Sequence, residues 1–425
     1  MILVTIAFVI LLICGLPVAF AMAAAGAVFF MQHPELPFTQ PAQQTISQTQ
    51  NFTLLAVPLF ILAGSLLNRS GITQRLLDLA TILTGRMRGG LAQASLALSA
   101  LIGGVSGSAI ADAAMQSRMI GGEMIARGMP RGFVAAILSF GAVLTPIIPP
   151  GIGMILFGTI GQVSIGRLFA AGLVPALLLW IALGMATAIT ARRNDWKPER
   201  KVRPTAKETV RALGAGFWAL LFPVVLLFGL RSGLFTPSEI GAFAVVYGMI
   251  VGFVIYRELD LRGFGDSVAI SLGDIGAVML LIAMSAALSY GIVLERVPEA
   301  VANAVLGVTE NLQLIMVMVA LLVLIAGFFI DATVLIIMLT PIVLPLVRAQ
   351  GGDPVHFGIV FIVAATLGNF TPPVGAAMYA VCTILKVPVG AYTRASIPLL
   401  IAVTLALIVM IFVPGLILFL PNLIF

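Results

Sequence analysis

The amino-acid sequence predicts an all-α polytopic membrane protein. The chain has 425 residues, of which 60% are hydrophobic and only 9% are charged, a balance far from that of a soluble domain. Apolar runs of about 18 or more residues can cross roughly 30 Å of hydrocarbon as helices. Nine such runs are present, near residues 2–30, 52–68, 133–156, 167–191, 212–231, 239–257, 274–294, 357–382 and 396–420.

A further observation that shapes the predicted fold is a repeated pair of interruptions within apolar segments. A small, polar run from Gly103 to Asp112 is followed by a proline-rich run from Thr145 to Gly151, and the same order recurs at 328–333 and 368–375. Backbone groups released where a membrane helix breaks must find partners in protein, water or ions. Paired breaks therefore predict a transport site near the centre of the bilayer.

The basic residues predict how the chain is oriented. The linker from Arg192 to Arg211 carries eight Lys or Arg against three acids, whereas residues 31–51 contain no Lys or Arg. Because cytoplasmic loops are enriched in Lys and Arg, the linker 192–211 is expected in the cytoplasm and the early loop on the opposite side. One short linker next to the membrane does not make a nucleic-acid-binding surface, so no nucleic-acid partner is expected.

The two halves of the chain, residues 1–191 and 212–425, are predicted to be inverted repeats. Each half runs through a span, a short amphipathic stretch, a broken segment, a proline-interrupted span and a final span. The identities that recur at a common shift pair Gly128 with Gly352, Pro130 with Pro354, Phe133 with Phe357, Val163 with Val387 and Gly166 with Gly390. The basic loops place the two halves in opposite orientations, as in many secondary transporters.

One segment in each half is too long for a single span and yet must return to the side on which it starts. We interpret residues 91–125 and 312–347 as re-entrant helical hairpins. Their tips are expected near 104–108 and 331–333, where small or polar residues interrupt the apolar runs.

The proline-interrupted segments 133–156 and 357–382 are predicted to be broken spans. Prolines cannot donate backbone hydrogen bonds, so the carbonyl groups one turn earlier, around Gly141 to Thr145, are left available as ligands. The short amphipathic stretches at 69–83 and 297–306 are expected to lie in the membrane interface instead of crossing it.

Oxygen atoms predominate at the first predicted tip. The hydroxyls of Ser106 and Ser108, with carbonyls freed by Gly103, Gly104 and Gly107, would form an all-oxygen shell suited to a hard cation. The alternative is that these small residues only let helices approach closely, as they commonly do in membranes. The equivalent break in the following span favours an ion site.

The second half repeats this pattern. Gly368, Asn369 and Thr371 lie on the broken span, and Asp331 and Thr333 lie on the hairpin. The amide of Asn369 can donate to a substrate oxygen or accept at a cation.

Asp112 and Asp331 are the clearest ionisable groups inside apolar segments. Such residues are costly at membrane depth and are usually functional. Either carboxylate could instead cap a hairpin helix by accepting bonds from free N–H groups. Both roles stay open, and one carboxylate can serve both.

A membrane-embedded protease is a remote alternative. Gly104-Val105-Ser106-Gly107 fits the Gly-x-Ser-Gly pattern around the nucleophile of rhomboid-like proteases. That chemistry needs a histidine base within hydrogen-bond reach. The two histidines, His33 and His356, are predicted in loops on the opposite side from the first hairpin's entrance. An enzyme is therefore not expected, and neither is an organic cofactor.

The motifs at 103–114, 146–150 and 371–375 resemble those of the large membrane subunit of tripartite ATP-independent periplasmic (TRAP) transporters. The segments 339–342 and 231–237 fit the same pattern, and the resemblance covers nearly the whole chain. It implies a sodium-driven importer of small organic acid anions in the bacterial inner membrane. It also implies an ion-transporter-superfamily fold of the elevator type, in which a hairpin domain moves against a scaffold.

The resemblance further implies two partners, a small four-helix membrane subunit and a periplasmic substrate-binding protein. Because the chain begins directly at the large-subunit pattern, the small subunit is expected as a separate chain. A sodium or proton symporter that works without partners would share the same ion site and repeat, and it stays as the alternative.

Sodium, as coupling ion, is the only metal expected. The candidate sodium ligands are Gly103, Gly104, Ser106, Ser108, Gly141, Thr145, Asp331, Thr333, Gly368 and Thr371. The candidate substrate contacts are Ser106, Pro150, Asn369, Thr371, Pro372 and Pro373. Asp112 is expected to be structural or ion-linked. Gly151 to Gly153 depart from the family pattern, in which a Ser often follows the second proline, so side-chain coordination there stays open.

Overall fold

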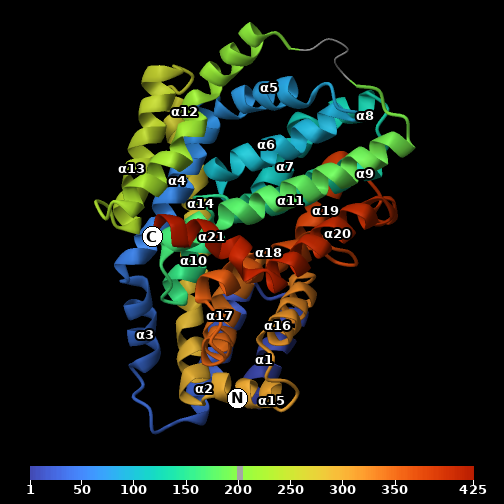
Figure 1. Cartoon of the computed structure of the whole chain (residues 1–425). Coiled ribbons are helices and arrows are strands. Elements are labelled where there is room, and N and C mark those ends of the chain that lie inside the picture. Colours follow the sequence, from blue (N-terminus) through green and yellow to red (C-terminus); the bar gives the residue numbers. More distant parts are fainter. Residues whose placement is uncertain (199–203) are drawn as a thin grey trace.

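The chain is an all-helical, multi-pass membrane protein. The computed structural model describes residues 1–198 and 204–425 (Figure 1). By length and composition, seven helices in these two ranges can cross a bilayer, and the bent pair Arg131–Ile147 and Ile152–Ile160 makes up to eight spans. The seven are Phe52–Arg69 (η1 and α4), Ile165–Arg193 (α11), Ala206–Arg231 (α12), Pro237–Ile255 (α13 and η3), Leu261–Leu294 (α14), Ala332–Ala349 (α17) and Val389–Phe412 (α20).

Three of the nine predicted spans are divided in the structure, and one of them is the bent pair named above. Residues 2–30 form α1 (Ile2–Ile13) and α2 (Val18–Gln32), because the chain turns at Gly15, whose φ is +82°. Residues 357–382 are split into α18 (Pro354–Phe370) and α19 (Ala376–Leu385), as expected for a broken span. Conversely, α17 was predicted as one arm of a hairpin and is long enough to span by itself.

Six helices form a group that we call the lateral bundle: α2, α3 (Gln40–Thr49), α4, α12, α13 and α14. α14 packs against α2, α3 and α4, and α4 packs along α13 (Figure 1). Glycines permit these close contacts. A Cβ atom at Gly248 of α13 would lie 3.4 Å from the Cβ atom of Leu66 on α4. The bundle therefore relies on close packing of small residues, as is usual between membrane helices.

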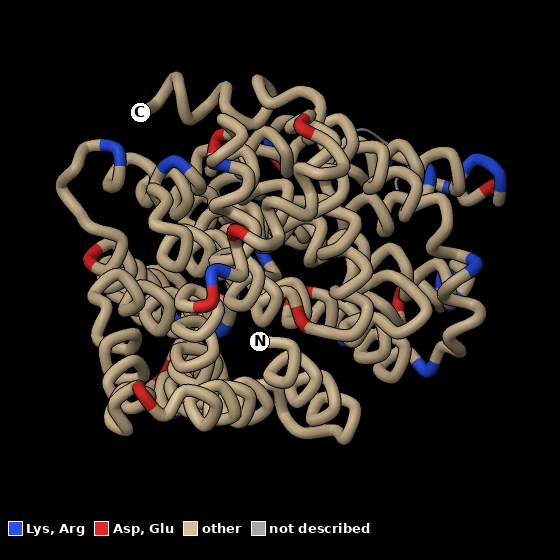
Figure 2. Tube along the Cα trace, turned by 90° about the horizontal axis from the view of Figure 1, so that it is seen from below, with Lys and Arg blue, Asp and Glu red and all other residues tan. Residues whose placement is uncertain are grey.

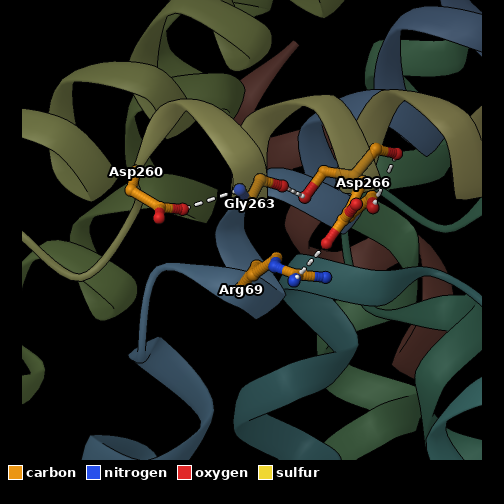
Figure 3. A network of polar contacts seen from close by, with 6 residues as sticks. Arg69, Asp260, Gly263 and Asp266 are labelled. Atoms are coloured by element: carbon orange, nitrogen blue, oxygen red, sulfur yellow. Dashed lines mark hydrogen bonds and ion pairs between the residues drawn. The ribbon is translucent and has the colours of Figure 1, made fainter.

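A polar junction fastens α4 to the start of α14 (Figure 3). The guanidinium of Arg69 lies 2.7 Å from the Asp266 carboxylate, and the Asp260 carboxylate accepts a 2.6 Å bond from the backbone N–H of Gly263. Asp260 is the N-cap of α14, so it satisfies one of the free N–H groups of that helix. These contacts fix the register between two long helices of the lateral bundle.

An ion pair joins the far ends of α2 and α14. His33 Nε2 lies 2.9 Å from the Glu295 carboxylate, and His33 Nδ1 lies 3.0 Å from the carbonyl oxygen of Phe29. The hydrogen bond to the Phe29 carbonyl, with a further contribution from Glu295, raises the pKa of His33 above its ordinary value. The folded protein therefore holds this proton more tightly than the unfolded chain does.

The stabilisation from this pair should depend on pH. Because the folded-state pKa of His33 is raised, the contribution is fully present below the ordinary histidine pKa of about 6.5 and is lost as pH rises through the folded value. We expect Glu295→Gln to lower the melting temperature of the detergent-solubilised protein more at pH 6 than at pH 9. Glu299→Gln, which removes an exposed carboxylate near Arg296, is the control and should show no such difference. Equal losses at both pH values would contradict the assignment.

Most of the other helices form a second group, the central domain. It contains a first hairpin, α6 and α7, with the short helix α8, and a second hairpin, α16 and α17. It also contains two broken segments, α9–η2–α10 and α18–α19, together with α11, α20 and α21. The bounds not yet given are Gly90–Ser106 (α6), Ala109–Met119 (α7), Gly121–Ala126 (α8), Arg131–Gly141 (α9), Ala142–Ile147 (η2), Ile152–Ile160 (α10), Leu312–Gly327 (α16) and Pro414–Ile424 (α21).

Inside the central domain, helices from the first half of the sequence pack on helices from the second half, an arrangement that we call crossed packing. α6 and α7 pack on η2, and α16 and α17 pack on α18, so each hairpin contacts the broken segment of its own half. In addition, α7 packs on α19, and α17 packs on α10. A Cβ atom at Gly161, which ends α10, would lie 2.7 Å from Leu344 of α17. The second helix of each hairpin therefore depends on a helix from the other half.

Two short helices connect the lateral bundle to the hairpins. α5 (Ile72–Thr84) packs between α12 and α6, and α15 (Val297–Leu306) contacts α14 and α17. They coincide with the stretches predicted as amphipathic helices at 69–83 and 297–306. Figure 2 shows that most of the tube carries no charged residue, as expected for helices that contact lipid.

Candidate functional site

The first hairpin reverses over two residues. Gly107 has a left-handed φ of +63°, which glycine adopts without a Cβ penalty, and Ser108 then caps α7 by accepting from the backbone N–H of Ala111. A hydrogen bond of 2.7 Å from Gln116 on α7 to Ser99 on α6 shows that the two helices run back along each other. The chain therefore reverses within residues 91–125, close to the tip expected near 104–108.

The tip of this hairpin lies against the break in the following segment. A Cβ atom at Gly107 would lie 2.7 Å from the carbonyl oxygen of Pro150, and one at Gly104 would lie 3.1 Å from that of Pro149. Gly103 approaches Thr145 equally closely, with 3.2 Å from its Cβ position to the Thr145 Cα atom. Three of the predicted glycines thus allow two interrupted backbones to meet, and any side chain there would displace backbone atoms.

A buried polar network connects the hairpin to η2. The Asp112 carboxylate accepts a 2.9 Å bond from the Thr145 hydroxyl and a second 2.9 Å bond from the Gln116 amide, whose nitrogen also donates to Ser99. All four side chains are at most 1% exposed. No basic side chain of the described residues pairs with Asp112. The carboxylate is therefore held by neutral donors alone.

The second hairpin reverses between Gly327 and Asp331. Its ends return together, because a Cβ atom at Gly352, just beyond α17, would lie 3.1 Å from Leu312 at the start of α16. Near the tip, α16 contacts α18 through glycines. A Cβ atom at Gly368 would lie 2.7 Å from the Gly327 Cα atom. The predicted ligand Gly368 thus lies where hairpin and broken segment are closest.

Asp331 connects this tip to the broken segment. One carboxylate oxygen caps α17 by accepting from the Thr333 N–H at 2.8 Å, and the other accepts a 3.0 Å bond from the Asn369 amide nitrogen. The hydroxyl of Thr371 donates to the Leu367 carbonyl at 2.7 Å. The capping role, one of the two roles that the sequence left open for Asp331, is therefore present, and the carboxylate also contacts Asn369.

Two buried oxygen atoms at these tips lack a hydrogen-bond partner within the described ranges. They are the hydroxyl oxygen of Ser106, at the end of α6, and the amide oxygen of Asn369, at the end of α18. A buried polar atom without a partner carries a desolvation cost, and such atoms are uncommon in folded proteins. Both residues had been predicted as site residues. Both oxygens are suited to accept from a substrate or to coordinate a hard cation.

The structure brings the predicted residues into two groups. Around the first hairpin lie Gly103, Gly104, Ser106, Ser108, Gly141, Thr145 and Pro150, with Asp112 beside them; around the second lie Asp331, Thr333, Gly368, Asn369, Thr371, Pro372 and Pro373. The sequence analysis missed Ser99 and Gln116. Both lie within regular helix, where a single polar side chain does not mark a break.

One histidine prediction is wrong. His356 is not in a loop but in the first turn of α18, where it is buried, and its Nε2 lies 2.8 Å from the Met410 carbonyl oxygen. The Asp353 carboxylate caps this turn, and Pro354 occupies the first helical position. No histidine of the described residues is hydrogen-bonded to Ser106.

Comparison with known proteins identifies the family. The family model described as tripartite ATP-independent periplasmic transporter, DctM component, matches residues 5–416. The chain is 32% identical to the sialic acid TRAP transporter large permease protein SiaM of Vibrio cholerae, over 97% of this chain and 96% of that protein. It is 33% identical to the isethionate TRAP transporter permease protein DctMQ of Oleidesulfovibrio alaskensis, over 96% of this chain but only 64% of that protein.

A solved structure shares the fold. The YdaH transporter of Alcanivorax borkumensis superimposes with a TM-score of 0.63, covering 89% of this chain and 88% of that one at 14% identity. The matches in sequence cover nearly the whole chain, and these relatives are permeases, not enzymes. The chain therefore belongs to the tripartite ATP-independent periplasmic transporter family, as its DctM component, the large membrane permease.

Proposed function

We propose that this chain is a sodium-coupled permease that imports a small organic acid anion. The observation that carries the proposal is the repeated contact between a hairpin and a broken segment. In each half a carboxylate of the hairpin holds a polar side chain at the break, Asp112 with Thr145 and Asp331 with Asn369. Broken helices with freed carbonyls and uncharged oxygen ligands suit a hard monovalent ion at the membrane midplane.

Sodium would be held by oxygen atoms at the two tips. The proposed ligands are those predicted from the sequence, supplied by Gly103, Gly104, Ser106, Ser108, Gly141, Thr145, Asp331, Thr333, Gly368 and Thr371. The unpartnered oxygens of Ser106 and Asn369 support an acceptor-rich site. The substrate would then contact Ser106, Pro150, Asn369, Thr371, Pro372 and Pro373, next to the ion, so that bound sodium completes the anion site.

The transport cycle would be of the elevator type. In this proposal the two halves are inverted repeats, and the central domain moves as one body against the lateral bundle, with α5 and α15 as flexible arms. The crossed packing of α7 on α19 and of α17 on α10 supports a single moving body, because neither hairpin can leave without the other. The linker 192–211 would face the cytoplasm, and the membrane would be the bacterial inner membrane.

Two partners complete the proposal, a small membrane subunit of four helices and a periplasmic binding protein that delivers the anion. The names of the two relatives include sialic acid and isethionate, which are both organic acids. These permeases are similar in sequence to this chain although their named substrates differ. This similarity supports the proposal that the binding protein, and not the permease, accounts for most of the substrate selection.

Uptake of a labelled panel of organic acids into proteoliposomes tests the function. With the permease, the small subunit and the binding protein present, we expect uptake under an inward sodium gradient and uptake at background level when potassium replaces sodium. Full uptake driven by a proton gradient alone would rule out sodium coupling. Unchanged uptake without the binding protein and the small subunit would favour the stand-alone symporter.

A further inference from the structure

The same hydrogen-bond arrangement occurs at both hairpins. The Asp112 carboxylate accepts from the Thr145 hydroxyl at 2.9 Å, and the Asp331 carboxylate accepts from the Asn369 amide nitrogen at 3.0 Å. Asp112 lies in the first turn of α7 and Asp331 is the N-cap of α17, so each carboxylate lies at the start of the second helix of its hairpin, and its partner lies on a broken segment next to the break. The two pairs differ in chemistry but use the carboxylate in the same way.

Each carboxylate accepts from the side-chain donor group of its partner, the hydroxyl of Thr145 or the amide NH₂ of Asn369, which keeps a second N–H. A threonine hydroxyl has one proton and two acceptor lone pairs, and an asparagine amide has an NH₂ donor and a carbonyl acceptor. Once Thr145 donates to Asp112, its lone pairs point elsewhere. Once Asn369 donates to Asp331, its amide oxygen is turned away from Asp331, and that oxygen is buried without a partner within the described ranges.

Every oxygen of the two carboxylates already accepts one hydrogen bond. One Asp112 oxygen accepts from Thr145 and the other from Gln116, and the network lies entirely in the interior. One Asp331 oxygen accepts from Asn369 and the other caps α17 through the Thr333 N–H. Both carboxylates therefore already hold side chains of the broken segments in a fixed orientation.

We propose that Asp112 and Asp331 are positioning residues, which orient the oxygens of Thr145 and Asn369 toward sodium without touching the ion themselves. The proposal rests on the proposed function and narrows it, because it moves Asp331 out of the ligand set and brings Asn369 in. It also explains Gln116, whose amide nitrogen donates to both Asp112 and Ser99 and so keeps the carboxylate in place. The partners of metal ligands commonly act in this way, and losing one typically costs about 10- to 100-fold in ion affinity.

The test measures sodium affinity in two ways, by uptake and by the sodium-induced rise in melting temperature of the purified permease complex. Asp112→Asn leaves one acceptor oxygen for two donors, so either Thr145 or Gln116 loses its partner. We expect the half-saturating sodium concentration to rise by about 10- to 100-fold in both assays. Maximal uptake at saturating sodium should fall much less, because the ligand oxygen is still present.

A double-mutant comparison of Asp112 with its partner Thr145 distinguishes a positioning role of the carboxylate from a purely structural one. Thr145→Val removes the oriented oxygen, and adding Asp112→Asn to it should cause no further loss of sodium affinity. Thr145→Ser, which keeps the hydroxyl, should restore affinity. Thr366→Val removes a buried hydroxyl of α18 that bonds to its own helix at Ile362, and as the control it should leave the half-saturating sodium concentration unchanged.

A second variant, Asp331→Asn, keeps the proposal testable if Asp112→Asn does not fold. Asp331→Asn keeps an oxygen that can cap α17, since asparagine is a good N-cap, but it presents an amide to the Asn369 nitrogen. It should show the same rise in half-saturating sodium. Half-saturating sodium within twofold of the wild type in both variants would overturn the proposal, as would additive losses in the Asp112→Asn/Thr145→Val pair. If sodium affects neither uptake nor melting of the wild type, the proposed function itself fails, and this inference fails with it.

Discussion

A disulfide between positions 166 and 230 should stop substrate uptake completely. Gly166 lies near the start of α11 in the central domain, and a Cβ atom there would be 3.6 Å from the Leu230 Cβ atom on α12 of the lateral bundle. This separation suits a disulfide. In the elevator proposal, the central domain moves and exposes the transport site to one side of the membrane and then to the other. A disulfide between the central domain and the lateral bundle would hold the site on one side.

The experiment uses a background in which Cys14 and Cys382 are replaced by serine. The cysteines at 166 and 230 are then oxidised in proteoliposomes, and uptake is measured before and after reduction. The matched control joins Leu66 and Gly248, both in the lateral bundle, whose Cβ positions are 3.4 Å apart. This second cross-link should leave uptake intact. Normal uptake through permeases fully cross-linked at 166–230 would show that the two groups do not move apart.

Replacing Gly368 by alanine should reduce uptake on the order of 100-fold, the size of effect that a misplacement of about 1 Å can have. The new Cβ atom would lie 2.6 Å from the Leu324 carbonyl oxygen and 2.7 Å from the Gly327 Cα atom. These are backbone atoms, so the hairpin must move away from α18. The shift would separate Asp331 from Asn369, the residue next to Gly368, and so disturb the second tip.

Uptake and the amount of permease in the membrane should be measured together. Gly390→Ala is the matched control, because Gly390 lies in a helix of the same half and has no neighbour within 4 Å of its Cβ position. That variant should transport normally, since alanine is the better helix former. If Gly368→Ala transports at the wild-type rate, the contact between α16 and α18 is not needed to form the site.

The main features of the fold could be predicted because they leave strong signals in the sequence. Helix breaks in a membrane need glycine, proline or small polar residues, and these marked both hairpin tips and both broken segments. The prediction failed where composition is ambiguous. The apolar run at 2–30 reads as one span bent at Gly15-Leu16-Pro17, and its composition does not show that the two sides of the bend are separate helices. Pro354 before His356 suggested a loop, but a proline is equally common at the first position of a helix.

The sequence predicted many of the candidate site residues, but it did not predict which of them contact each other. Asp112 and Asp331 stood out as charges in apolar segments, but their partners could not be deduced from one sequence. Thr145 lies 33 residues from Asp112, and Asn369 lies 38 residues from Asp331. Ser99 and Gln116 gave no signal, because a single polar residue inside a helix is compatible with many environments. Only the folded arrangement shows that these side chains form one network.

The crossed packing has a consequence for synthesis of the protein. α7 ends at residue 119, but α19, against which it packs, starts only at residue 376. At about 5 to 20 residues per second, the first hairpin waits roughly 10 to 50 seconds in the membrane before its partner is made. During that interval, polar groups meant for the interior must be sheltered by lipid headgroups, water or the insertion machinery. A nascent chain that stalls in its second half therefore leaves the first hairpin complete but without α19, one of the helices on which it packs.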